Sequence, residues 1–140
     1  MPKKMLVVED EKIDAISIGR ALKQQFPDIA LEIVINGEQA LDWIQRYRAN
    51  PDETISLVLM DLTIPRMSGL DLISQFKGHP HLRTVPIVIL SGSDSPQAIK
   101  AAYQSGASGY VVKPATSAEM RDILGKTLNY WLDANRLSQA

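Results

Sequence analysis

Five polar side chains that could act in chemistry each come at the end of a short apolar run of the sequence. They are Glu9, Asp10, Asp61, Ser91 and Lys113. Together they offer three carboxylates, one hydroxyl and one ammonium. Two like charges about 4 Å apart repel by roughly 4 kcal/mol at an effective dielectric constant of 20. If the carboxylates lie together, cations must offset this repulsion, and Lys113 supplies only one positive charge.

A carboxylate cluster without histidine or cysteine suits a hard divalent cation. Proteins usually bind Mg²⁺ through one or two carboxylates, waters and phosphate oxygens, so we expect Mg²⁺ as the cofactor. With the metal and the ammonium neutralising phosphoryl oxygens, a carboxylate could accept a phosphoryl group and form a labile acyl phosphate. Taken singly, each residue has a structural explanation, such as acids favoured at a helix N-terminus. The combination favours the chemistry.

The apolar runs that lead to these residues are typical of buried parallel strands. Runs rich in Val, Ile and Leu recur over residues 5–8, 31–35, 55–60, 87–90 and 110–112. Most are near-continuous rather than alternating, as in strands covered by helices on both faces. The carboxyl ends of parallel strands lie along one edge of the sheet, where such folds place their ligands. We therefore expect the five polar side chains to share a crevice.

The segments between these runs have the spacing of amphipathic helices. Apolar residues recur every three or four positions at Ala15, Ile18, Leu22 and Phe26, at Ala40, Leu41, Ile44 and Tyr47, and at Leu70, Ile73 and Phe76. Ser95-Pro96 predicts the start of a fourth helix, and the capping-box pattern from Thr116 to Glu119 predicts the start of the last. This (βα)₅ alternation predicts a doubly wound α/β fold with a five-stranded parallel sheet.

The composition is that of one compact soluble domain. The chain has 140 residues, of which 45% are hydrophobic and 22% charged, and its net charge is −1. This balance favours neither nucleic acid nor an anionic membrane as a partner. There is no cysteine, which excludes disulfides, and the first apolar run is too short for a signal peptide or a membrane span. We expect a cytoplasmic protein.

The domain is expected to cover residues 1–133. Residues 134–140 lack apolar periodicity and are expected to form a C-terminal tail that extends the last helix or frays. The connections over residues 48–54 and 77–85 contain proline and turn-forming residues, and we predict both to be surface loops.

In combination, these motifs resemble the receiver domain of two-component response regulators, the CheY-like family. They are an acidic pair after the first strand (Glu9-Asp10), Met-Asp-Leu-x-x-Pro-x-Met-x-Gly over residues 60–69, Ser91 after the fourth strand and Lys113-Pro114 after the fifth. The resemblance covers nearly the whole chain. It implies the flavodoxin-like strand order 2-1-3-4-5 and a stand-alone response regulator, a signalling switch rather than an enzyme.

The resemblance also implies which residues hold the metal. Asp61 would be the phosphoacceptor and a metal ligand, and Asp10 would bind Mg²⁺ directly. Glu9 would support the metal through water, and the backbone carbonyl of Thr63 would complete the protein ligands.

Three further residues would respond to the phosphoryl group. Ser91 would hydrogen-bond one phosphoryl oxygen, and Lys113 would pair with another, positioned by a cis bond to Pro114. Tyr110 occupies the family's aromatic switch position, where the ring turns into space that the moving hydroxyl residue opens. An ordinary strand aromatic packed on the core is the alternative for Tyr110.

The partners follow from the same resemblance. A sensor histidine kinase would donate the phosphoryl group near the first helix and the strand-end loops. The 78–85 loop and residues 130–133 resemble single-domain regulators paired with bacterial phytochromes. Many of these form homodimers through the fourth helix, fifth strand and fifth helix, which makes Tyr103, Tyr110, Tyr130 and Leu137 candidate interface residues. Trp131 continues the apolar stripe of the last helix and is expected in the core.

Other functions stay open on the residues alone. A receiver that acts only as a scaffold, without phosphorylation, is disfavoured by the intact set of site residues. A haloacid-dehalogenase-type phosphohydrolase also uses Mg²⁺ and an aspartate nucleophile, but it needs Asp-x-Asp where this chain has Glu9-Asp10-Glu11. An FMN-binding flavodoxin-like module needs a phosphate-binding loop at the same place, and an acidic loop would repel the phosphate.

Overall fold

A five-stranded parallel sheet forms the centre of the molecule. The computed structural model describes residues 3–49 and 53–137. The strands are β1 (Lys3–Val8), β2 (Ala30–Val34), β3 (Thr54–Met60), β4 (Ile87–Ser91) and β5 (Gly109–Val112), in the order β2-β1-β3-β4-β5. Every neighbouring pair is parallel. The predicted fold class and strand order are confirmed.

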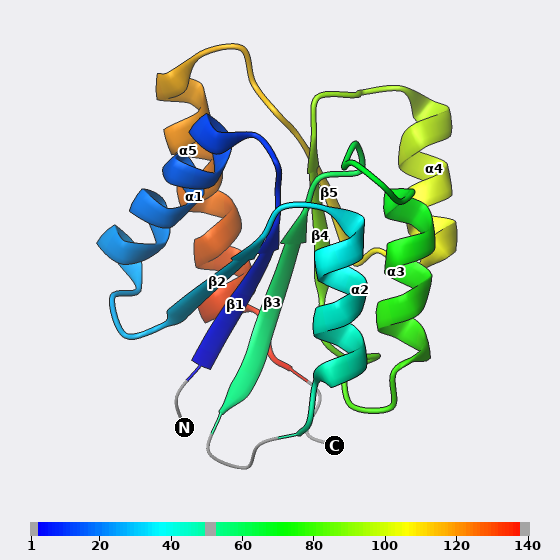
Figure 1. The fold of residues 1–140 in the computed structure, drawn as a ribbon. Helices are drawn as coiled ribbons and strands as arrows, with labels where there is room; N and C mark the ends of the chain where they lie inside the picture. The colour runs from blue at the N-terminus through cyan, green and yellow to red at the C-terminus, as the bar shows by residue number, and fades with distance from the viewer. Residues whose placement is uncertain (1–2, 50–52, 138–140) are drawn as a thin grey trace.

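Helices cover both faces of the sheet. They are α1 (Lys12–Gln25), α2 (Gly37–Arg46), α3 (Gly69–Gly78), α4 (Pro96–Ser105) and α5 (Ser117–Asn129), and α5 is followed by one wider helical turn, η1 (Tyr130–Ala134). Figure 1 shows α1 and α5 on one face and α2, α3 and α4 on the other. No helix in the described ranges is long and apolar enough to span a membrane. Residues 138–140 of the expected tail lie outside the described part of the chain.

The near-continuous apolar strands are explained by two cores, one on each face. Alternate residues of β1 point to opposite faces: Leu6 and Val8 pack with α2, α3 and α4, whereas Met5 and Val7 pack with α1 and α5. Trp131 is partly buried and packs against the second core, as the apolar stripe predicts. Because both faces of each central strand are buried, successive residues of the strand can all be apolar.

Side-chain caps fix where the helices begin. Ser95 Oγ accepts the N–H of Ala98 at 3.3 Å, and Thr116 Oγ1 accepts the N–H of Glu119 at 3.1 Å. Both predicted helix starts are therefore confirmed. Such a cap typically contributes about 1 kcal/mol to stability.

The connection over residues 77–85 is anchored in the core. Leu82 is fully buried, and Val85 is buried beside it in the core under α2, α3 and α4. The Lys77 ammonium donates to the carbonyls of Arg83 at 3.1 Å and Val85 at 3.2 Å. Residues 78, 80, 81, 83 and 84 are exposed, so the predicted surface loop is confirmed, and two isolated apolar residues anchor it to the core. Of the other predicted loop, residues 50–52 lie outside the described part of the chain.

The loop that follows β3 is held against the start of α2. The N–H of Gly37 donates to the carbonyl of Pro65 at 3.0 Å, and a Cβ at Gly37 would overlap the Cβ of Met67. Arg66 has a positive φ of 73°, which few residues other than glycine adopt. Helix α2 therefore fixes the path of the chain just after Asp61.

We expect Gly37→Ala to lower the free energy of unfolding by about 1–3 kcal/mol, because the added methyl must displace the 65–67 loop. Urea unfolding followed by circular dichroism measures this. Gly78→Ala is the matched control, since a Cβ at the exposed Gly78 meets nothing within 4 Å. Equal stability of the two variants would contradict the close packing of α2 on the loop.

Candidate functional site

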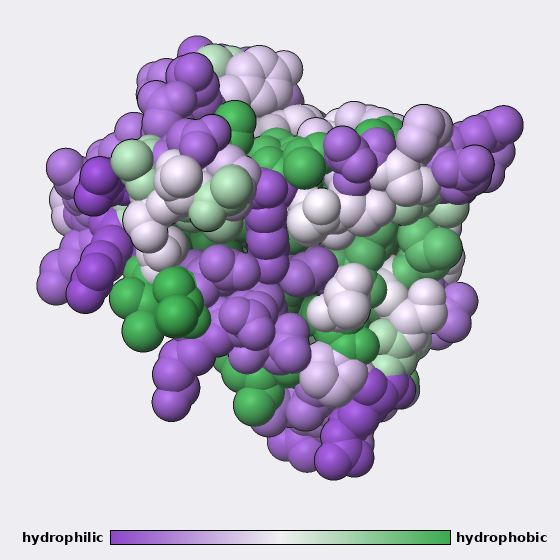
Figure 2. All heavy atoms as spheres, turned by 90° about the horizontal axis from the view of Figure 1, so that it is seen from above, coloured by the Kyte–Doolittle hydropathy of each residue, from purple (hydrophilic) through white to green (hydrophobic). Residues whose placement is uncertain are grey.

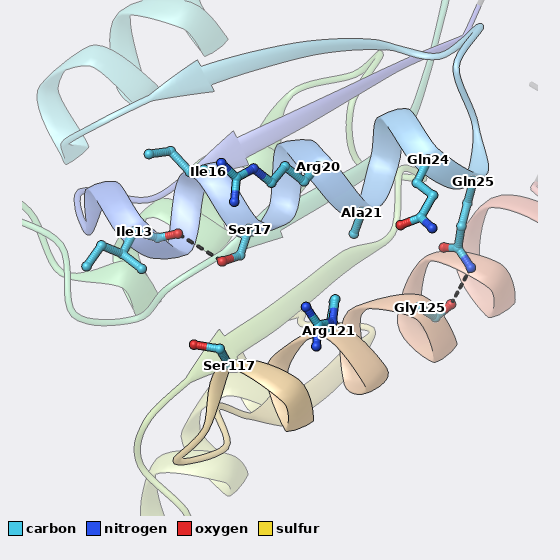
Figure 3. A pocket seen from close by; sticks show the side chains of 10 residues that line it. All are labelled: Ile13, Ile16, Ser17, Arg20, Ala21, Gln24, Gln25, Ser117, Arg121 and Gly125. Atoms are coloured by element: carbon cyan, nitrogen blue, oxygen red, sulfur yellow. Dashed lines mark hydrogen bonds between the residues drawn. The ribbon is translucent and has the colours of Figure 1, made fainter.

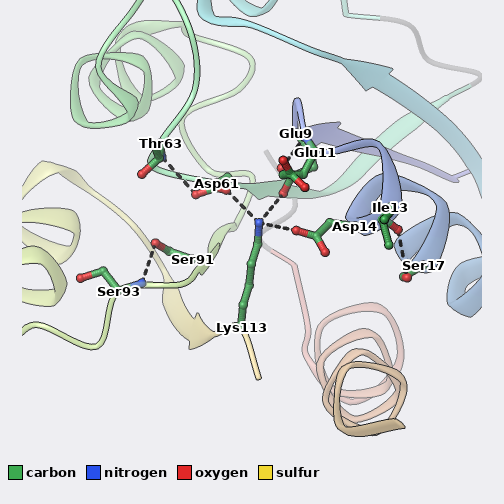
Figure 4. A network of polar contacts seen from close by, with 10 residues as sticks. All are labelled: Glu9, Glu11, Ile13, Asp14, Ser17, Asp61, Thr63, Ser91, Ser93 and Lys113. Atoms are coloured by element: carbon green, nitrogen blue, oxygen red, sulfur yellow. Dashed lines mark hydrogen bonds and ion pairs between the residues drawn. The ribbon is translucent and has the colours of Figure 1, made fainter. Parts of the chain in front are cut away.

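The carboxyl ends of the strands open onto one face of the molecule. Figure 2 views this face from above and shows hydrophilic side chains across its middle, with hydrophobic patches around them. Two features on this side of the molecule are candidates for function. One is a cavity of about 790 Å³ between α1 and α5 (Figure 3), and the other is a network of polar side chains at the strand ends (Figure 4).

Backbone hydrogen bonds carry the sheet just past the strand ends and so position the polar network. The backbone N–H of Asp61 donates to the carbonyl of Val8 at 3.1 Å, and the backbone N–H of Lys113 donates to the carbonyl of Ser91 at 2.7 Å. Glu9 follows β1 directly, as Asp61 follows β3 and Lys113 follows β5. Neighbouring strands in the order β1, β3, β4 and β5 therefore bring these side chains to one place.

The Lys113 ammonium lies among three carboxylates. Its Nζ donates to Asp14 Oδ2 at 2.7 Å, to Asp61 Oδ2 at 2.8 Å and to Glu9 Oε2 at 3.0 Å. An ammonium has three N–H donors, so all three are used. The side chains of Glu9 and Asp61 are 1% and 9% exposed, and that of Lys113 is 13% exposed. The network is thus largely shielded from water, which strengthens its charge interactions.

Burial shifts the pKa of two groups in this network. Burial raises the pKa of Glu9, although the N–H of Glu11 and the Lys113 ammonium act in the opposite direction. Burial alone would lower the pKa of Lys113, but its hydrogen bonds to Asp14, Asp61 and Glu9 outweigh this effect and raise the pKa overall. Lys113 is therefore charged at neutral pH and balances part of the surrounding negative charge.

Both oxygens of the Asp61 carboxylate have a partner. Oδ2 accepts from Lys113, and Oδ1 accepts the N–H of Thr63 at 3.0 Å. The hydrogen bond from Thr63, two residues further along the chain, closes a turn that fixes the orientation of the carboxylate relative to Lys113. Asp61 is 7% exposed as a whole residue. It is therefore held in one orientation at the edge of the sheet.

Ser91 and Tyr110 are linked through Ser93. The Ser91 hydroxyl accepts the N–H of Ser93 at 3.3 Å, and the Tyr110 hydroxyl donates to the Ser93 carbonyl at 2.7 Å. Ser91 is buried and Tyr110 is half-buried. The loop after β4 thus connects the hydroxyl near the carboxylates to the aromatic ring on β5.

The structure differs from the sequence-based expectation in two respects, the isomer of the Lys113–Pro114 bond and the place of Asp14. The Lys113–Pro114 bond is trans rather than cis, and trans is the isomer that X–Pro bonds generally favour. Asp10 is exposed and does not join the contacts of Lys113. Asp14, from the first turn of α1, takes a place in the network that was not expected.

Asp14 left a weak signal in the sequence. It is an acidic residue close behind the Glu9-Asp10 pair, near the predicted start of the first helix. An acid in the first turn of a helix is also common for electrostatic reasons that need no partner. Only the folded structure, in which α1 packs with α5 on one face of the sheet, reveals that Asp14 reaches Lys113.

The oxygen donors at this edge suit a hard cation. The expected ligands, the carboxylates of Glu9, Asp10 and Asp61 and the carbonyl of Thr63, are all oxygen donors, which matches the ligand preference of Mg²⁺. Over residues 3–49 and 53–137, no three acidic or histidine side chains are gathered as a metal site. Instead, the ammonium of Lys113 lies between the carboxylates.

The cavity between α1 and α5 lies beside the network rather than at it. Ile13 and Ile16 line it and are 73% and 48% exposed. Figure 3 shows Arg20 on α1 and Arg121 on α5 among the side chains that line it. Gln25 bridges the helices at one end by donating to the carbonyl of Gly125 at 3.4 Å. The cavity is therefore an amphipathic groove next to the Asp14 end of the network.

Comparison with known proteins identifies the family. The sequence model of the response regulator receiver domain matches residues 5–125. The chain belongs to this family. The receiver is 28% identical over 142 residues to the response regulator Rcp1 of Synechocystis sp., covering 99% of this chain and 95% of the relative. It is 30% identical over 132 residues to the probable methanogenesis regulatory protein FilR2 of Methanothrix harundinacea, covering 94% and 85%.

Solved structures agree with this assignment. The phosphorylated cyanobacterial phytochrome response regulator RcpA superposes with a TM-score of 0.89 at 26% identity, covering 99% of the receiver and 100% of that chain. The Mn²⁺-bound form of Rcp1 gives a TM-score of 0.87 at 26% identity, covering 99% and 100%. The receiver is therefore a signalling switch of the two-component type, which interacts with a sensor histidine kinase. Membership decides against the phosphohydrolase and the FMN module.

We expect Lys113→Met to lower the free energy of unfolding without metal by about 1–2 kcal/mol, because three carboxylates lose their shared cation. Urea unfolding in EDTA measures this. Added Mg²⁺ should stabilise the variant more than the wild type, since the ion then supplies the missing positive charge. Lys126→Met is the control, because the Lys126–Asp122 pair is exposed at the surface. A Lys113 variant as stable as this control would contradict the role of the ammonium.

Proposed function

We propose that Asp61 accepts a phosphoryl group from a phosphohistidine of a sensor kinase. The observation that carries this proposal is the position of the Asp61 carboxylate, which lies at the strand ends with Oδ2 at 2.8 Å from the Lys113 ammonium. An oxygen of Asp61 attacks phosphorus as the bond from phosphorus to the histidine nitrogen breaks. The ammonium is already placed to offset the charge of the transferred group.

Mg²⁺ is the proposed cofactor. Asp10, Asp61 and the carbonyl of Thr63 would bind the ion, and Glu9 would support it through water. When bound, Mg²⁺ neutralises negative charge on the phosphoryl oxygens. The exposed position of Asp10 leaves its carboxylate free to turn towards the ion. The existence of a Mn²⁺-bound form of the relative Rcp1 supports a divalent ion at this site.

Ser91 and Lys113 would hold the phosphoryl group after transfer. Lys113 would keep one N–H directed at a phosphoryl oxygen in place of Asp61 Oδ2. The Ser91 hydroxyl accepts a hydrogen bond from Ser93, so its own proton remains available to donate to another phosphoryl oxygen. The receiver would act on no other substrate, and its own acyl phosphate would hydrolyse slowly.

The signal would leave the site through Ser93. Movement of Ser91 towards the phosphoryl group changes its contact with the N–H of Ser93, whose carbonyl accepts from Tyr110. The hydrogen bond from Tyr110 to the Ser93 carbonyl then breaks or shifts, and the face made by α4, β5 and α5 changes with it. The phosphoryl group favours one of two conformations by its differential contacts.

The groove between α1 and α5 is the proposed docking surface for the kinase. It lies beside the Asp14 end of the network and exposes Ile13 and Ile16, which a partner would cover. A bacterial phytochrome is the proposed kinase. This rests on the likeness to RcpA, which is a cyanobacterial phytochrome response regulator.

A homodimer through α4, β5 and α5 is the proposed output of phosphorylation. Tyr103 on α4, Val112 on β5 and Tyr130 on η1 are 48%, 40% and 53% exposed. Strand β5 lies at the edge of the sheet, so a second copy can approach this face. Tyr110 and Leu137 are half-buried and would contribute at the margin of the interface.

We expect Asp61→Asn to incorporate no phosphoryl group from acetyl phosphate and Mg²⁺, because the amide cannot replace the attacking carboxylate. Intact-mass spectrometry measures the covalent addition. Asp71→Asn makes the same change on the exposed surface of α3 and should be phosphorylated like the wild type. Incorporation by the Asp61 variant at the wild-type level would reject Asp61 as the phosphoacceptor, whereas no incorporation by the wild type would leave the scaffold function.

The dimer is tested by gel filtration with and without beryllofluoride, a phosphoryl mimic, in the presence of Mg²⁺. We expect beryllofluoride to shift the receiver to the elution volume of a dimer. Tyr103→Asp should reduce this shift, because a charge is then buried at the interface. One unchanged monomer peak under both conditions would contradict the proposed dimer.

A further inference from the structure

Asp14 is an acidic residue that the proposed phosphotransfer does not use. It lies in the first turn of α1, and its side chain is 21% exposed. Its Oδ2 accepts from Lys113 at 2.7 Å, which is shorter than the distances of 2.8 Å and 3.0 Å from Lys113 to Asp61 and Glu9. In the described residues, Lys113 is its one ion-pair partner. Asp14 thus contacts the group that the phosphoryl group also needs.

The ammonium of Lys113 has no donor to spare. Its three N–H groups are occupied by Glu9, Asp14 and Asp61. When Asp61 carries a phosphoryl group, only the donor that faced Asp61 can turn to the phosphoryl oxygens. Asp14 therefore keeps a share of the positive charge that would otherwise hold the phosphoryl group.

Asp14 also adds a negative charge close to the reacting atoms. Asp14 Oδ2 and Asp61 Oδ2 accept from the same nitrogen, as Figure 4 shows, so the two oxygens are near neighbours. At such separations, in a partly shielded site, two charges interact strongly and salt screens them little. This charge repels an anion bound at Asp61 and attracts a cation bound beside it.

We propose that Asp14 is a positioning residue that sets the charge balance of the site through Lys113. Its carboxylate weakens the hold on the phosphoryl group and strengthens the binding of the divalent ion. This inference rests on the proposed function, since it concerns the same site. Asp14 thereby shifts the balance between the unphosphorylated and phosphorylated states towards the first.

The opposite signs of the two effects provide the test. Asp14→Asn removes the charge but keeps an oxygen that can accept from Lys113. Its affinity for beryllofluoride at saturating Mg²⁺ should rise by about three- to tenfold, and its affinity for Mg²⁺ alone should fall by a similar factor. Titration calorimetry measures both. A residue with only a structural role would weaken both affinities together.

Asp71→Asn is the matched control, because it removes one carboxylate charge from the first turn of α3 without touching Lys113. It should leave both affinities within about twofold of the wild type, since exposed charges are screened. If Asp14→Asn changed both affinities in the same direction, or changed them no more than the control does, this inference would be overturned and the proposed function would stand. A wild-type receiver that binds no beryllofluoride would overturn the proposed function, and this inference with it.

Discussion

The contact between one ammonium and three carboxylates is the constraint around which the site is built. Lys113 can reach Glu9, Asp14 and Asp61 only because β1, β3 and β5 end at one edge of the sheet and α1 packs beside them. The largely buried carboxylates need this positive charge, since an unpaired buried charge is strongly destabilising. The same excess of negative charge makes the edge suitable for a divalent ion. Stability and proposed chemistry therefore depend on the same side chains.

Much of the fold and the centre of the site could be predicted from the sequence. Strands buried on both faces are near-continuous apolar runs, and a polar residue directly after such a run must lie at the ligand-binding edge of a parallel sheet. This reasoning placed Glu9, Asp61 and Lys113 together without knowledge of their distances. The helix caps at Ser95 and Thr116 could also be predicted, because each cap hydrogen bond joins residues only three positions apart.

What the sequence did not reveal depends on tertiary contacts. Asp14 comes from a helix rather than a strand end, and its contact with Lys113 is visible only in the folded structure. The burial of Leu82 inside a polar connection depends on how the loop after α3 folds back onto the core. The family resemblance suggested a cis bond at Pro114, but Lys113 reaches the carboxylates with the bond in trans. Each of these features is set by distant residues, which no local pattern encodes.

The central claim is that Asp61 receives the phosphoryl group where Lys113 and a divalent ion can neutralise it. A crystal structure of the receiver with Mg²⁺ and beryllofluoride tests this most directly. The account predicts beryllium bound to Asp61, fluorine atoms in contact with Lys113 and Ser91, and the metal held by Asp10 and Asp61. Beryllofluoride bound at another carboxylate, or an Asp61 complex from which Lys113 and the metal are remote, would contradict it.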